Sequence, residues 1–108
     1  QMLEAMYAVG KRLPAELPDC THVCHIFAVR CADRNALEKH LNARGIGTNK
    51  HYPTPIHLQG AYAELGLGRG ALPLAEEISA TELSLPMFYG MTDAQVQAVI
   101  DAVNEFEG

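Results

Sequence analysis

The sequence predicts a single α+β domain, in which a small sheet with antiparallel pairs has helices packed on it. Helical periodicity and β-type runs alternate along the 108 residues without a regular repeat. The composition, 48% hydrophobic and 19% charged, is typical of a globular domain that is large enough to bury a core. A capped amphipathic pattern near the C-terminal end supplies one helix to cover the sheet.

Residues 1–21 are expected to form an N-terminal helix and a connector, and residues 22–108 the domain proper. Prolines follow residue 13 and restrict the preceding residues to extended geometry, so they should end the helix there. Because the chain opens at Gln1 inside the helical pattern, we expect it to be part of a longer polypeptide. The apolar side chains that predict this helix are Met2, Met6, Val9 and Leu13.

The segment HVCHIFAVR, residues 22–30, is predicted to be the central strand. Its near-continuous run of β-branched and aromatic side chains is typical of a strand covered on both faces. On such a strand Cys20, His22 and Cys24 would share one face and His25 would point to the other, which argues against a shared metal ion. We therefore expect ordinary interior side chains and reduced thiols here, and no bound metal.

A helix over residues 34–44 and a rigid loop are predicted next. Asp33 stands at the N-cap position, and Gly45 can adopt the left-handed conformation that ends a helix. The segment IGTNKHY is expected to be extended. Residues 53–57, PTPIH, should be loop because two prolines remove two backbone donors within three residues.

The second half of the chain is predicted to be mostly helical. One or two turns over residues 58–65 should stop at Gly66, and Pro73 suits the first position of a further helix. Residues 83–87, LSLPM, are expected to form the second extended segment. The last helix should begin with a capping box of Thr92 and Gln95 and bury Val96, Val99, Ile100 and Val103.

Charge and hydropathy exclude several partners. The formal net charge is −5 and the eight Lys and Arg residues are scattered, which argues against a nucleic-acid surface. No apolar run approaches 18 residues and no signal peptide pattern opens the chain. We therefore expect a cytoplasmic protein with no membrane partner.

The loop sequence KHYPTPIHLQGAY, residues 50–62, is the candidate site. His51 and His57 could converge on one ion, but no Asp, Glu or Cys lies in the loop to complete a metal site. Prolines fix the backbone, so the side chains of this loop can meet a ligand at little ordering cost. Histidine and tyrosine held in this way suit recognition of a polar ligand.

Several segments together resemble one known family. HIFAVR, RNALEKHLNARGIGT, HYPTPIHLQGAY, LPLAEEISATELSLPMF and MTDAQVQAVIDAV resemble, in order and spacing, the C-terminal domain of DegT/DnrJ family PLP-dependent sugar aminotransferases. The resemblance covers residues 22–106. It implies the C-terminal small domain of the PLP fold type I, or aspartate-aminotransferase-like, transferases.

The resemblance also implies the reaction and the partners. Family members are homodimers that transfer an amino group, usually from glutamate, to a keto sugar attached to a nucleotide. Their larger N-terminal domain carries the lysine that forms the Schiff base with PLP. This chain would be the small domain alone, with that large domain as the missing part of the same polypeptide.

The resemblance assigns substrate contacts but no catalytic or cofactor-binding residue. His51 and Tyr52 match the pair that members place near the substrate sugar, and His57 either contacts ligand or orients the loop. Lys11, Lys39 and Lys50 lack the setting of the Schiff-base lysine, so we expect an inactive fragment without bound PLP. A free-standing ligand-binding or regulatory module of the same fold is the alternative, and a Cys/His metal-binding domain is less favoured.

Overall fold

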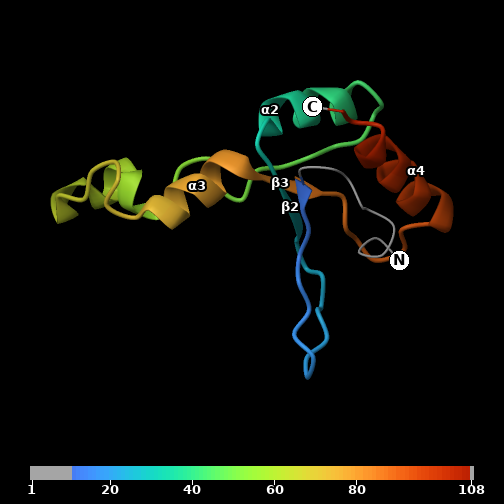
Figure 1. Cartoon of the computed structure of the whole chain (residues 1–108), viewed down its shortest axis with the longest axis horizontal. Coiled ribbons are helices and arrows are strands. Elements are labelled where there is room, and N and C mark those ends of the chain that lie inside the picture. Colours follow the sequence, from blue (N-terminus) through green and yellow to red (C-terminus); the bar gives the residue numbers. More distant parts are fainter. Residues whose placement is uncertain (1–10, 108) are drawn as a thin grey trace.

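The computed structural model describes residues 11–107 and shows a small sheet with helices around it (Figure 1). The α+β architecture is therefore as predicted. In chain order the elements are β1 (Lys11–Arg12), β2 (Phe27–Cys31), α2 (Arg34–Asn42), η1 (Ile56–Leu58), η2 (Gly60–Leu65), α3 (Pro73–Thr81), β3 (Glu82–Leu85) and α4 (Asp93–Asn104), where η denotes a 3-10 helix.

The sheet has the strand order β1-β2-β3, and both pairs are antiparallel. The strand β2 is central, as predicted, and pairs Phe27 with Leu85 and Arg30 with Glu82. The predicted helix over residues 1–13 lies mostly outside the described residues. Its end is wrong, because Lys11 and Arg12 form β1 and pair with Cys31 and Arg30.

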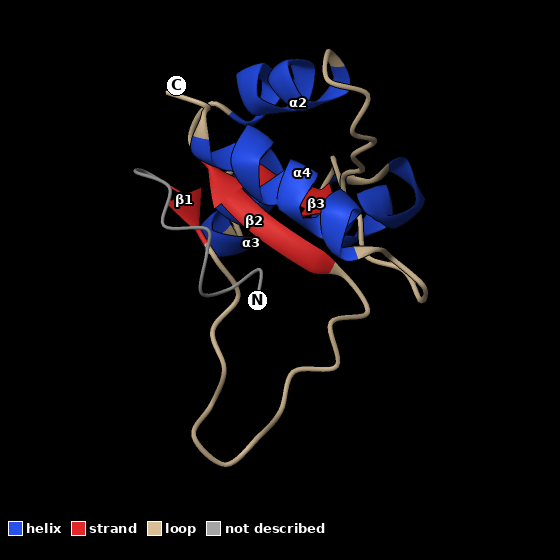
Figure 2. Ribbon diagram, turned by 90° about the vertical axis from the view of Figure 1, so that its right-hand side faces the viewer, coloured by secondary structure: helices blue, strands red, loops and turns tan. Residues whose placement is uncertain are grey.

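The strand β2 starts at Phe27, five residues later than predicted. Residues 13–26 leave the sheet as a long loop (Figure 2), and Cys24 has a left-handed backbone with φ 52° that a strand cannot contain. The prediction that Cys20, His22 and Cys24 share a strand face is therefore wrong. Cys20 is exposed in this loop, whereas Cys31 at the end of β2 is buried.

The core lies between the sheet and the pair α2 and α4, which pack against each other (Figure 2). Burial along β2 alternates, so one face is fully covered and the other is half-covered, in contrast to the predicted burial of both faces. The six largest fully buried side chains among the described residues are Phe27, Leu37, Leu41, Leu83, Val29 and Val103.

The predicted helix boundaries hold where a side chain makes the cap. Asp33 Oδ1 accepts a hydrogen bond from the backbone N–H of Ala36 at 3.1 Å. Thr92 and Gln95 form the reciprocal capping box at the start of α4. The helix α2 ends at Asn42, two residues before the predicted end, and Gly45 takes the expected left-handed conformation with φ 74°.

An arm made of η1, η2 and α3 projects from the sheet on the side opposite to α4 (Figure 1). Pro73 begins α3 and Gly66 ends η2 with φ 67°, both as predicted. Ile56 and His57 of the predicted loop form the single 3-10 turn η1 together with Leu58. Large apolar side chains stay exposed along the arm, namely Ile56, Tyr62, Leu65, Leu67, Leu72, Leu74 and Ile78.

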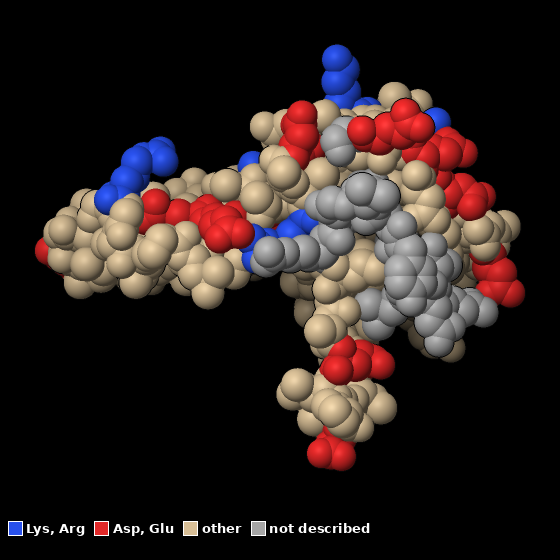
Figure 3. All heavy atoms as spheres, viewed as in Figure 1, with Lys and Arg blue, Asp and Glu red and all other residues tan. Residues whose placement is uncertain are grey.

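Charged groups are dispersed over the face shown in Figure 3, where Asp and Glu lie between separate Lys and Arg side chains. The visible face carries no basic patch. This distribution agrees with the net charge of −5.

Candidate functional site

The candidate site is built on a backbone bridge between the loop and β3. Asn49 N–H donates to the Ser84 carbonyl at 3.1 Å, and Ser84 N–H donates to the Asn49 carbonyl at 2.8 Å. This bridge brings residues 35 positions apart in the chain into contact, counted as 84 minus 49. It lays the predicted extended segment alongside the sheet and places His51 next to β3.

Two buried polar residues of β3 hold His51, one through its side chain and the other through its backbone. Its Nδ1 lies 2.8 Å from Ser84 Oγ, and its backbone N–H donates to Glu82 Oε2 at 2.8 Å. Ser84 Oγ in turn donates to Glu82 Oε1. Glu82 and Ser84 are only 4% and 5% exposed, so these hydrogen bonds satisfy polar groups that water does not reach.

Tyr52 extends from the same point toward solvent. The residue is 65% exposed, and its ring lies edge-on to His51, with 5.3 Å between ring centroids and 88° between ring planes. A flat apolar ring and a hydroxyl are therefore presented next to the imidazole. The peptide bond between His51 and Tyr52 is cis.

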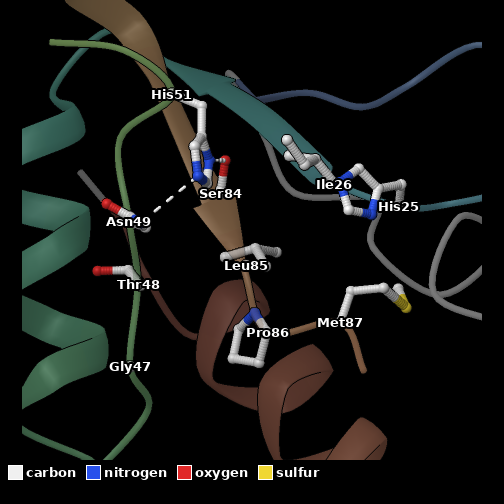
Figure 4. Close-up of a pocket in the computed structure, with 10 residues that line it drawn as sticks. All are labelled: His25, Ile26, Gly47, Thr48, Asn49, His51, Ser84, Leu85, Pro86 and Met87. Atoms are coloured by element: carbon white, nitrogen blue, oxygen red, sulfur yellow. Dashed lines mark hydrogen bonds between the residues drawn. The ribbon is translucent and has the colours of Figure 1, made fainter. Parts of the chain in front are cut away.

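Two hollows meet at His51. A hollow of about 320 Å³, shown in Figure 4, lies between the two residues that precede β2, the 47–51 segment and the C-terminal end of β3. Within it the His51 ring lies between Ser84 and Asn49. A second hollow of about 600 Å³ lies along the arm and is lined by His51, Tyr52 and His57 together with apolar side chains. The site can thus offer polar contacts on one side and apolar surface on the other.

His57 lies in a different setting from His51. It is 5% exposed, and its Nε2 lies 2.9 Å from Glu76 Oε1 on α3. The hydrogen bond from His57 holds the pKa of the Glu76 carboxyl below its usual range, against the opposing effect of desolvation. The same Glu76 oxygen accepts the Gly70 N–H at 2.8 Å. His57 therefore ties the loop to α3, and a contact from it to substrate stays a prediction.

The sequence analysis did not identify the partners of the two histidines. It did not single out Asn49, Glu82 or Ser84, although polar residues two apart in a buried strand were a usable signal. It also did not predict that Glu76 pairs with His57. Only the fold reveals that pairing, since the partners lie 19 positions apart.

The two lysines with described side chains lie outside both hollows at His51. Lys50 Nζ lies 2.7 Å from Glu38 Oε2, and Lys39 is exposed on the surface of α2. That neither lysine holds PLP covalently stays a prediction. Among residues 11–107, no group of three His, Cys, Asp or Glu side chains could hold a metal ion.

Comparison with known proteins agrees with the earlier resemblance. The sequence profile of the DegT/DnrJ/EryC1/StrS aminotransferase family matches residues 2–104. The chain belongs to this family. Within the described part, no helix is long and apolar enough to cross a membrane.

Named relatives and a solved structure extend the comparison. The dTDP-3-amino-3,4,6-trideoxy-alpha-D-glucose transaminase of Streptomyces venezuelae is 45% identical over 97 residues, which are 90% of this chain and 26% of that protein. A pleiotropic regulatory protein of Geobacillus stearothermophilus is 40% identical over 93 residues, 86% of this chain and 25% of its own length.

The crystal structure of S. venezuelae DesV in complex with a ketimine intermediate matches with a TM-score of 0.91 and 43% identity, over 96% of this chain and 28% of that one. The chain thus spans about a quarter of the length of these relatives.

Proposed function

We propose that this chain is the C-terminal small domain of a PLP-dependent aminotransferase, which moves an amino group from glutamate to a nucleotide-linked keto sugar in the cytoplasm. Family membership and a 45% identical relative named as a dTDP-amino-sugar transaminase support this proposal. The intact enzyme would hold PLP in its large domain and act as a homodimer. The described residues would contribute sugar contacts rather than chemistry.

The observation that carries the proposal is the His51–Tyr52 pair, held on β3 at the meeting point of two hollows. An imidazole can exchange hydrogen bonds with hexose hydroxyls, and an exposed phenol ring gives flat surface for a sugar face. His57 would support this pair by fixing the loop to α3.

The test uses the complete reading frame that encodes this chain, with glutamate and a dTDP-linked keto hexose as substrates. We expect glutamate consumption that depends on the sugar, and an amino sugar identified by mass spectrometry. His51→Ala and Tyr52→Ala should each raise the KM for the sugar by about tenfold, the value of one good hydrogen bond or ring contact, with the KM for glutamate unchanged. Tyr89→Ala is the matched control, because Tyr89 is fully exposed and lines neither hollow.

An unchanged KM for the sugar in both loop variants would remove His51 and Tyr52 from the site. The 108-residue chain alone should not transaminate, since Lys50 is ion-paired with Glu38 and Lys39 is exposed on α2. Glutamate consumption by the isolated chain with added PLP would contradict this expectation.

A second candidate is a regulatory module that binds a nucleotide sugar without turning it over. The 40% identical relative named as a pleiotropic regulatory protein favours it. The same assay separates the two functions, because a regulatory module would bind a dTDP-linked sugar and consume no glutamate.

A further inference from the structure

His51 belongs to a closed set of hydrogen bonds with Glu82, Ser84 and Asn49, which fixes where its protons lie. We propose that Glu82 and Ser84 are positioning residues that hold the His51 ring with its proton on Nδ1. The unprotonated Nε2 then accepts a hydrogen bond from a hydroxyl or amino group of the sugar. Only the contact with the sugar rests on the proposed function. The proton positions on His51 follow from the hydrogen bonds of this chain.

The direction of the hydrogen bonds starts at Glu82. An ionised carboxylate has no donor, so both of its oxygens accept here, one from His51 N–H and the other from Ser84 O–H. A hydroxyl has one proton, so Ser84 can only accept at its remaining contact with His51 Nδ1, at 2.8 Å. The imidazole must therefore donate from Nδ1, and in the neutral ring Nε2 is unprotonated.

The other end of the set agrees with this assignment. Asn49 Oδ1 accepts the Lys50 N–H at 2.8 Å, which turns the amide NH₂ group of Asn49 toward the ring. That group lies 3.4 Å from His51 Nε2, so it donates to an acceptor there (Figure 4). The contact is long and Asn49 is exposed, so a sugar hydroxyl can replace it at small cost.

The second histidine of the loop has the opposite arrangement. The carboxylate of Glu76 accepts from His57 Nε2, so His57 carries a proton on that nitrogen. In the same loop, Nε2 of His51 is therefore a hydrogen-bond acceptor in the open hollow, whereas Nε2 of His57 is a donor in a buried contact. The sugar group opposite His51 must then bring its own proton.

The tautomers are read from long-range ¹H–¹⁵N spectra of the ¹⁵N-labelled 108-residue chain at neutral pH. We expect His51 to show a protonated Nδ1 and an unprotonated Nε2, and His57 to show a protonated Nε2 as the internal control. A protonated Nε2 at His51 in the wild-type chain overturns the proposal, and this result needs no variant.

Glu82→Gln is the sharpest variant. Its amide oxygen must face the fixed His51 N–H, so its NH₂ group would donate to Ser84, which would then donate to His51 Nδ1. We expect the proton of His51 to move to Nε2 while His57 is unchanged. If Glu82→Gln does not fold, Ser84→Ala is the second variant, because it removes the acceptor opposite Nδ1 and should also move the proton to Nε2. An unchanged His51 tautomer in the variant that folds overturns the proposal.

Kinetics of the complete enzyme separate this inference from the proposed function. We expect Glu82→Gln to raise the KM for the dTDP-linked keto hexose about tenfold, because Nε2 would then carry a proton and could no longer accept a hydrogen bond from the sugar hydroxyl, and to leave the KM for glutamate unchanged. Suppose that His51→Ala raises the KM for the sugar, and that Glu82→Gln reverses the His51 tautomer but leaves this KM unchanged. The sugar contact of His51 is then supported, and the positioning role of Glu82 is refuted. If neither variant changes the sugar KM, the sugar contact itself is refuted.

Discussion

Replacing Leu41 by alanine should strongly destabilise the domain. Leu41 lies on α2, is 0% exposed and belongs to the core cluster between the sheet and α4. Removing about three buried carbon groups at ~0.8 kcal/mol each gives about 2.4 kcal/mol, and the residual cavity raises the cost to about 3 kcal/mol. A domain of this size has a stability on the order of 5–15 kcal/mol, so this single change removes a large share of it.

The measurement is urea unfolding of the 108-residue chain followed by circular dichroism, with Leu74→Ala as the matched control. Leu74 undergoes the same chemical change on α3 but is 63% exposed, so its loss should stay within about 0.5 kcal/mol. We expect Leu41→Ala to lower the unfolding midpoint with an unchanged slope, and the Tm by roughly 12–24 °C. Equal losses for the two variants would refute the assignment of the core to the α2 and α4 side.

Three further predictions test local features. Thr92→Ala removes the capping box of α4 and should cost about 1 kcal/mol in urea unfolding; an unchanged midpoint would show that the cap does not stabilise the helix. Gly45→Ala forces a side chain into a backbone with φ 74° and should lower stability by about 1 kcal/mol, although a Cβ there meets no atom within 4 Å; a gain in stability would contradict the strain argument. The pKa of Glu76 is lowered from its ordinary 4.5, so its stabilising contribution is full above that value and is lost as the pH falls through the lower folded-state pKa. The stability difference between wild type and Glu76→Gln should therefore be largest at neutral pH and shrink below about pH 4.5, and a difference that does not change with pH would refute the role of the Glu76 carboxylate as a hydrogen-bond acceptor.

The sequence predicted the features that depend on neighbouring residues. Asp33 and the pair Thr92 and Gln95 cap helices through partners only three positions away, so spacing alone identifies them. The start of β2 could not be placed in this way. The apolar run HVCHIF suits a strand, but Cys24 turns the chain away from the sheet, and no local rule requires a left-handed cysteine.

The surroundings of the candidate residues were only partly predictable from the sequence. Prolines marked the loop, and the family resemblance singled out His51 and Tyr52. The partners of His51 were not predicted, because the bridge between Asn49 and Ser84 is a tertiary contact that neither segment encodes alone. Polar residues in the buried strand ELSL indicated some internal partner without identifying it.

The loop owes its shape to anchors at both ends as well as to its prolines. His51 is bound to β3, and His57 is bound to α3 through Glu76. The arm that carries Glu76 is itself fixed at its base, because Arg30 donates to Thr81 at 3.1 Å and Arg34 donates to the Ser79 carbonyl at 2.8 Å.

Between the two histidine anchors lie Pro53 and Pro55, whose φ angles are restricted, so fixing the ends leaves the segment few conformations. Tyr52 is 65% exposed and would lose conformational freedom on binding if it stood on a free loop. Because the backbone on both sides of Tyr52 is already ordered, most of the entropy cost of fixing it is met when the chain folds. A sugar that contacts the ring would therefore bind more tightly than it would to a free loop.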